Sequence, residues 1–197
     1  QKIKEKKELR GLPDDLIRLA LNDYVSKNKL NALDSEKNQK IAIKEVRSEL
    51  RRYTGQYTTK HSLKKREALL QKGSFSELLK EHVSTRERLK DYYIIKKIIS
   101  KINPSSILDL GCGLNPIAMA KKGVRYHAYD INYSDLEIVK KFFESREIDG
   151  DIHHKDITKE AVFPKTDLCI IFKVLDILGK NKTQIAKNLL TNIDSKF

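Results

Sequence analysis

The sequence predicts an α/β fold with a mostly parallel sheet in the second half of the chain, preceded by an all-α segment. Two observations support this prediction. Residues 104–197 alternate short apolar stretches with helical patterns, an order typical of parallel sheets. Residues 1–103 show helical periodicity and no strand pattern. We therefore expect a helical domain over residues 1–103 and an α/β domain over residues 104–197.

The composition limits the class of protein. Of the 197 residues, 39% are hydrophobic and 34% are charged, which allows both a core and a well-solvated surface. There is no apolar run of about 18 residues, and the sequence opens on a charged stretch rather than on an apolar segment of signal-peptide type. We therefore expect no membrane segment and a cytoplasmic location. The two cysteines, Cys112 and Cys169, are too few for a disulfide framework or a zinc site, and we expect no bound metal.

Positive charge is concentrated in the first half of the chain. Residues 1–100 contain 25 basic and 14 acidic side chains, a net charge of +11, while the whole chain carries +13. Such a bias favours a surface that binds phosphates, as in an RNA-binding protein. The alternative is a solvated helical surface with no partner.

Helix signals divide the first half. Ser74 and Ser84 are each followed three residues later by a glutamate, the spacing of a capping box. Asn103-Pro104 ends the last of these helices, because a proline disfavours helical backbone in the residue before it. The expected helices begin near Pro13, after Asp34, near Leu63, at Ser74 and at Ser84.

Four stretches in the second half have the character of strands: residues 106–110, 124–129, 150–155 and 168–173. Ligands of parallel sheets bind at the carboxyl ends of the strands. Gly111, Asp130, Asp156 and Lys173 all fall at such ends.

A glycine turn, Gly111-Cys112-Gly113, joins the first of these strands to a helix. This arrangement brings backbone N–H groups to a ligand, and glycine permits the close approach. We expect Asn115 to cap the helix and Pro116 to occupy its first position.

The turn favours S-adenosyl-L-methionine over a dinucleotide. Asp130 lies 19 residues after Gly111, where a carboxylate can accept hydrogen bonds from both ribose hydroxyls. Pro116 stands where a dinucleotide fingerprint requires Gly or Ala. Asp109, next to the turn, suits the cationic methionine end of S-adenosylmethionine better than a pyrophosphate, although it could also simply support the turn.

Two motifs resemble those of a known family. I-L-D-L-G-C-G-L-N-P, residues 107–116, resembles the first motif of class I methyltransferases, which have a Rossmann-like fold. Together with H-V-S-T-R-E-R-L, residues 82–89, it resembles the aminoglycoside-resistance 16S rRNA (guanine-N7) methyltransferases of the Arm or Rmt type. The resemblance implies methylation of a guanine in the decoding site, with the 30S subunit as partner. We expect a monomer, whose role is either drug resistance or ribosome maintenance.

The resemblance also implies site residues. Gly111 and Gly113 would approach the methionine part of the cofactor, Asp130 and Ile131 the ribose, and Asp156 and Ile157 the adenine. An arginine of S-T-R-E-R would meet the cofactor carboxylate, with Arg86 preferred and Arg88 as the alternative. Lys173, in I-F-K-V-L, would face the catalytic cleft. In the plainer interpretation Asp130 and Asp156 cap helices, and Arg86, Arg88 and Lys173 are solvated charges.

The chain departs from the family pattern in two places. Asp176 replaces the proline that usually follows I-F-K-V-L. The family's sheet continues beyond the point where Lys196-Phe197 would start a fifth strand, so we expect the C-terminal strands to be missing and this fragment to be impaired in catalysis.

Methylation of guanine N7 requires no general base, because N7 has an in-plane lone pair and no proton. The required chemistry is therefore in-line positioning, and no His or Cys nucleophile is expected. His153 and His154 are adjacent on a strand and should face opposite ways, which argues against a shared metal. Two other functions stay open: a methyltransferase acting on another RNA or a small molecule, and a non-catalytic basic RNA-binding protein with the same fold.

Overall fold

A computed structural model describes residues 2–6, 9–10, 12, 14–28, 35–54, 63–158, 162–174 and 182–197. The chain divides into two compact units, residues 1–58 and 59–197. The second unit, which contains the sheet, therefore also contains the helices between residues 63 and 102. These helices pack against the helices that cover the sheet. The assignment of RNA binding to residues 1–103 concerns function and stays a prediction. Among the described residues, no helix is long and apolar enough to cross a membrane.

The first unit is helical, as predicted. It contains the 3-10 helix η1 (Lys2–Glu5) and the helices α1 (Asp14–Asn28) and α2 (Glu36–Thr54). Ala42, Val46 and Leu50 recur every four residues and form the buried stripe of α2. Ile41, one position before Ala42, lies off this stripe and is 44% exposed. The predicted start signals Pro13 and Asp34 lie outside the described residues.

The second unit is built on a parallel sheet. Its strands are β1 (Ser106–Leu110), β2 (Arg125–Asp130), β3 (Gly150–His154) and β4 (Leu168–Ile171), in the order β3-β2-β1-β4. Residues 195–197 run beside β4, where the Cys169 N–H donates to the Phe197 carbonyl at 2.9 Å. No fifth strand is formed at Lys196-Phe197, where only an isolated parallel bridge joins Thr166 to Ser195, so the predicted start of that strand is not confirmed. The parallel α/β fold class is confirmed.

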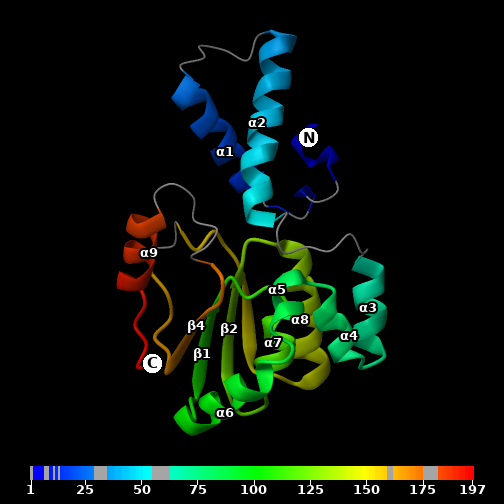
Figure 1. Ribbon diagram of the computed structural model, residues 1–197, viewed down its shortest axis with the longest axis vertical. Helices are drawn as coiled ribbons and strands as arrows, with labels where there is room; N and C mark the ends of the chain where they lie inside the picture. The colour runs from blue at the N-terminus through cyan, green and yellow to red at the C-terminus, as the bar shows by residue number, and fades with distance from the viewer. Residues whose placement is uncertain are drawn as a thin grey trace. The chain divides into compact units, whose positions relative to one another are not determined.

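Helices cover both faces of this sheet (Figure 1). One face carries α7 (Asn115–Met119) and α8 (Tyr133–Arg146), with α3 (Leu63–Gln71), α4 (Phe75–Lys80), α5 (Val83–Glu87) and α6 (Tyr92–Ile102) around them. The other face packs against α9 (Lys182–Thr191), whose Leu189 lies in a buried cluster with Leu108 and Leu110. Alternate residues of β1 thus enter two separate cores.

The helix predicted to begin at Ser84 is divided into two. Helix α5 ends at Glu87 and α6 begins at Tyr92, with a turn between them. The Ser84 hydroxyl does not cap a helix but accepts a hydrogen bond of 2.6 Å from Arg88 Nη1. Ser74 does lie at the N-cap position of α4, but its side chain makes no capping hydrogen bond. The capping-box interpretation is therefore wrong at both serines.

A buried ion pair joins α3 to α8. The Arg66 guanidinium donates to the Asp135 carboxylate in the first turn of α8, and both side chains are almost fully buried. A second Arg66 nitrogen donates to the Glu81 carbonyl at 3.1 Å. Since the Asp135 charge has little access to water, it depends on Arg66 for compensation.

We predict that Arg66→Met destabilises the protein by about 3–5 kcal/mol, because it leaves a buried carboxylate unpaired. Urea unfolding followed by circular dichroism measures this change. Lys141→Met is the matched control, since it breaks an exposed ion pair between the same two helices, Lys141–Glu67. A loss of stability in Arg66→Met no larger than in Lys141→Met would show that the buried pair is not required.

Candidate functional site

The glycine turn after β1 is clamped to the end of β2. The N–H groups of Gly111 and Cys112 both donate to the Tyr129 carbonyl, at 2.8 and 2.9 Å. The Gly113 N–H donates to Oδ2 of Asp130 at 2.7 Å. Both glycines have positive φ angles, +69° and +51°, which an L side chain rarely adopts. The turn and Asp130 therefore lie side by side, as the sequence predicted.

Asp130 supports two turns at once. Besides binding Gly113, its Oδ1 accepts a hydrogen bond of 2.8 Å from the N–H of Asn132, the N-cap residue of α8. Burial, followed by the charge of Asp135, raises the Asp130 pKa to about 7. A carboxylate has about four acceptor sites and Asp130 uses two of them here, so it retains capacity for ribose hydroxyls. The structural and the ligand-binding interpretations of Asp130 are thus compatible.

A buried network lies under the end of β1. Asp109 accepts hydrogen bonds from Tyr126 Oη at 2.6 Å and from Asn115 Nδ2 at 2.8 Å, and Tyr92 Oη donates to Asn115 at 3.0 Å. Burial raises the Asp109 pKa to about 6, and these hydrogen bonds oppose the rise. The prediction that Asn115 caps α7 is wrong, because Leu114 is the N-cap residue and the Asn115 side chain belongs to this network.

The side chains of Val174 and His82 pack closely against the glycine turn. A Cβ atom added at Gly111 would lie 2.3 Å from Cγ2 of Val174, and one added at Gly113 would lie 2.8 Å from Cε1 of His82. Glycine is therefore required at both positions by packing as well as by backbone conformation.

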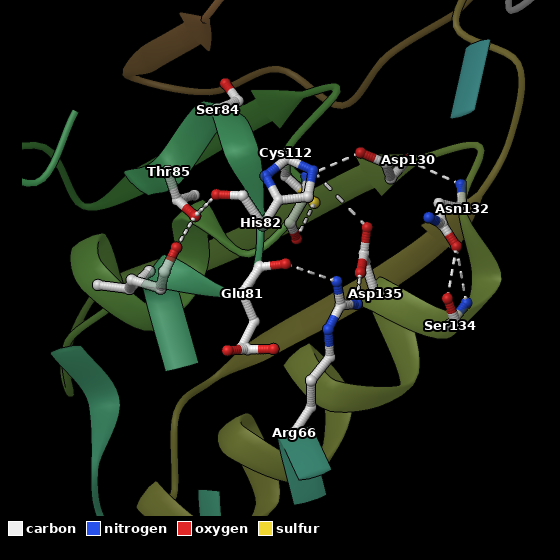
Figure 2. Close-up of polar contacts among 12 residues, drawn as sticks. Arg66, Glu81, His82, Ser84, Thr85, Cys112, Asp130, Asn132, Ser134 and Asp135 are labelled. Atoms are coloured by element: carbon white, nitrogen blue, oxygen red, sulfur yellow. Dashed lines mark hydrogen bonds and ion pairs between the residues drawn. The ribbon is translucent and has the colours of Figure 1, made fainter. Parts of the chain in front are cut away.

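His82 is a site residue to which the sequence assigned no role. Its imidazole lies beside the glycine turn, and its Nε2 is 3.8 Å from Oδ2 of Asp135 (Figure 2). Burial lowers the His82 pKa to about 4, outweighing the attraction of Asp135. The available signal was its position at the start of the motif H-V-S-T-R-E-R-L, although nothing in that motif indicates contact with Gly113.

The two candidate arginines differ in their surroundings. Arg88 is half-buried, and its guanidinium carbon lies 4.7 Å from the centroid of the Phe172 ring. Its buried Nε has no hydrogen-bond partner among the described residues, as expected of a group that awaits an acceptor. Arg86 is exposed on α5. This placement favours Arg88, the alternative in the sequence-based prediction, as the arginine that meets a carboxylate.

Lys173 also lies next to α5. It forms an ion pair with Glu87, and the ammonium holds the pKa of that carboxyl below its ordinary value. Its φ angle of +59° marks a sharp change of direction after β4. The structure therefore brings residues 82–89 together with residues 171–174, the described part of the second predicted site segment. Leu175 and Asp176, the departure from the family pattern, lie outside the described residues.

Asp156 and Ile157, predicted near the adenine, lie after β3, and Ile131, predicted near the ribose, follows β2. Asp156 Oδ1 accepts hydrogen bonds from the Thr158 N–H at 3.1 Å and from the Thr158 hydroxyl at 2.7 Å, so it stabilises a local turn. Ile157 is buried in the cluster with Leu108 and Leu110. The Ile131 carbonyl lies 3.1 Å from His154 Nε2. Ligand contact for these three residues stays a prediction.

The arrangement suits binding and positioning better than covalent catalysis. Burial raises the pKa of the Cys112 thiol well above its ordinary value, which removes it as a nucleophile. The groups at this edge of the sheet are a backbone turn, an acceptor carboxylate and an arginine with an unused donor. Such groups match a nucleoside that also carries an amino-acid carboxylate.

Comparisons with known proteins found a matching family model and a curated relative. A family model described as "Ribosomal RNA methyltransferase (FmrO)" matches residues 59–197. A 16S rRNA (guanine(1405)-N(7))-methyltransferase of Serratia marcescens is 28% identical over 191 residues, which cover 96% of this chain and 73% of that protein.

Two solved structures share the fold. The 16S rRNA methylase RmtB aligns with a TM-score of 0.82 and 27% identity, covering 98% of this chain and 78% of that chain. The 16S rRNA methyltransferase RmtF, crystallised in complex with S-adenosyl-L-homocysteine, aligns with a TM-score of 0.82 and 25% identity, covering 98% of this chain and 75% of that chain.

We predict that Gly111→Ala is more destabilising than Gly123→Ala. Both glycines have positive φ angles, for which alanine costs about 1–2 kcal/mol. Only at Gly111 does the new methyl group also collide with Val174, at an additional cost of about 1–3 kcal/mol. Chemical denaturation of both variants measures the difference. Val174→Ala should reduce the penalty in Gly111→Ala, and equal penalties at the two glycines would contradict the packing argument.

We predict that the His82 ring stays neutral well below pH 6.5. Because its folded-state pKa of about 4 lies below the ordinary histidine value of 6.5, its contribution to stability is complete above pH 6.5. That contribution is lost as the pH falls through about 4. NMR titration of the ring resonances, assigned by comparison with His82→Gln, measures the pKa directly. A midpoint near 6.5 would show that the ring is hydrated and not packed beneath the turn.

Proposed function

Because this chain belongs to the ribosomal RNA methyltransferase (FmrO) family, we propose that it transfers a methyl group from S-adenosylmethionine to N7 of a guanine in 16S rRNA. The match spans the whole second unit, residues 59–197. The single structural observation that supports the proposal best is the convergence at one edge of the sheet of the glycine turn, Asp130 and Arg88. The Serratia marcescens relative is named for methylation of guanine N7 in 16S rRNA, and the RmtF structure contains the demethylated cofactor.

The cofactor would bind along this edge of the sheet, where its ribose hydroxyls and its carboxylate would each find a hydrogen-bond partner in the protein. Asp130 would accept hydrogen bonds from the ribose hydroxyls while still holding the Gly113 N–H. Arg88 would donate its unused Nε to the carboxylate of the methionine part. Gly111 and Gly113 would line the path between the two groups. When bound, S-adenosylmethionine supplies a methyl group on a positively charged sulfur atom.

The task of the protein in this reaction is positioning. Guanine N7 presents an in-plane lone pair and carries no proton, so no side chain has to remove one. The site must hold N7 in line with the methyl group at about 3 Å and exclude other geometries. The target base has to leave its stack to reach such a pocket. Lys173, exposed after β4 and beside α5, would assist by contacting the nucleotide or its phosphate.

The first unit would bind the ribosomal RNA. It contains a groove on which basic side chains outnumber acidic ones. Lysine and arginine along one surface supply the sequence-independent part of RNA affinity through phosphate contacts. The basic residues that line the groove are Lys2, Lys6, Lys40, Lys44, Arg47 and Arg51, against Glu5 and Glu36. A small-molecule methyltransferase has no need of this surface.

Because this fragment is expected to be impaired in catalysis, methyl transfer is tested with the full-length protein, purified 30S subunits, purified tRNA and S-adenosylmethionine labelled in the methyl group. We expect label in 16S rRNA, recovered as 7-methylguanine after digestion, and binding to 30S that weakens steeply with salt. Label in tRNA with none in 30S would replace this target by another RNA. Tight binding to 30S without any transfer would favour the non-catalytic RNA-binding alternative.

We predict that Arg88→Met weakens the binding of S-adenosylhomocysteine by at least about tenfold, since a hydrogen bond to a charged group is worth roughly 1.5–3 kcal/mol. Isothermal titration calorimetry measures this affinity. Arg86→Met is the matched control, since Arg86 lies two residues earlier in the last turn of α5, and this variant should bind like the unmodified chain. The opposite pattern would assign the cofactor carboxylate to Arg86.

A further inference from the structure

We propose that His127, Asp151 and His153 form a binding site for a late first-row divalent metal ion such as Zn²⁺. The three side chains offer two imidazole nitrogens and one carboxylate oxygen, and these ligand atoms all lie within 4.8 Å of one another. The site lies on the strands β2 and β3 and shares no residue with the proposed methyl-transfer site.

The strand register explains why these residues meet. His127 on β2 is paired with Asp151 on β3, and Tyr129 is paired with His153. Residues two apart on a strand point to the same face, so Asp151 and His153 lie on the side of the sheet that carries His127. His154 points the other way, and its Nε2 lies 3.1 Å from the Ile131 carbonyl. The adjacent histidines therefore do face opposite ways, but His153 finds its partners across the strands.

The distances suit a small ion. Zinc binds imidazole nitrogen and carboxylate oxygen at about 2.0–2.2 Å, which places tetrahedral ligand atoms about 3.3 Å apart. His127 Nδ1 and Asp151 Oδ2 are already 3.1 Å apart. His153 requires only a small side-chain adjustment to complete the set, since its ligand atom lies within 4.8 Å of both. Two imidazoles and one carboxylate are a ligand set that zinc takes in proteins, with water as the fourth ligand.

The surroundings hold the ligands and leave a path from solvent. The His153 ring is stacked on Tyr129, with ring centroids 4.1 Å apart. The Asp151 side chain is 40% exposed, whereas that of His127 is only 14% exposed. Arg125 donates to Asp151 at 2.8 and 2.9 Å, and its charge opposes that of a metal ion. Arg125 also pairs with Asp149, so it keeps an acidic partner when Asp151 turns to the metal.

The simpler explanation is an ion-pair network of Arg125, Asp151 and His127 that needs no metal. The pairs Arg125–Asp151 and His127–Asp151 hold that network together, so a loss of zinc affinity on removal of the His153 imidazole separates the two explanations. A metal ion would also cross-link β3, at the edge of the strand order, to its neighbour β2. Binding to the folded state alone would then raise the thermal midpoint with metal concentration.

The test is calorimetric titration and thermal unfolding of the whole chain with ZnCl₂ in a buffer that does not chelate zinc. We expect one zinc per chain and a raised midpoint. His153→Ala and Asp151→Asn should each weaken binding by at least about tenfold, as loss of a ligand or of its support does. His154→Ala, the matched control on the same strand, should bind like the unmodified chain. Titration with Co²⁺ should give absorption bands without thiolate charge transfer, which excludes Cys112 and Cys169 as ligands.

Two results would overturn the proposal. One is the absence of zinc binding by the unmodified chain. The other is equal affinity in His153→Ala and His154→Ala, which would place the ion elsewhere. Circular dichroism of each variant establishes that a loss of binding is not a loss of folding.

Discussion

The arrangement of the site depends on the hydrogen bonds between the glycine turn and the end of β2. Two N–H groups of the turn share the Tyr129 carbonyl, and the third, from Gly113, binds the Asp130 carboxylate. Backbone donors of a turn in a protein interior require acceptors, and here the neighbouring strand supplies them. The same bonds set the distance between the turn and Asp130, the two features that a nucleoside would contact.

These hydrogen bonds are part of a ring of contacts that begins and ends at Gly113. Asp130 binds the N–H of Asn132, which caps α8. Asp135 follows in the first turn of α8 and lies 3.8 Å from His82. His82 in turn packs against Gly113. These contacts connect the glycine turn, the end of β2, the start of α8 and His82 through buried or half-buried polar groups.

Local signals in the sequence predicted the sheet well. The strand at residues 106–110, the glycine turn and the position of Asp130 were all predicted, because strand periodicity and glycine spacing act over a few residues. Features that depend on distant partners were missed. Asn115 has the sequence of a cap but binds Asp109. Arg86 was preferred to Arg88 from the sequence, whereas the structure places Arg88 beside the distant Phe172.

The long-range ion pair between Arg66 and Asp135 has a consequence for the order in which this chain folds while it is being synthesised. The two residues are 69 positions apart in the chain. At a synthesis rate of about 5–20 residues per second, the α3 segment emerges roughly 3–14 seconds before its partner helix. During that interval the guanidinium is hydrated, and α3 cannot take its final place. Nascent chains of this protein therefore complete this half of the core only after α8 has left the exit tunnel.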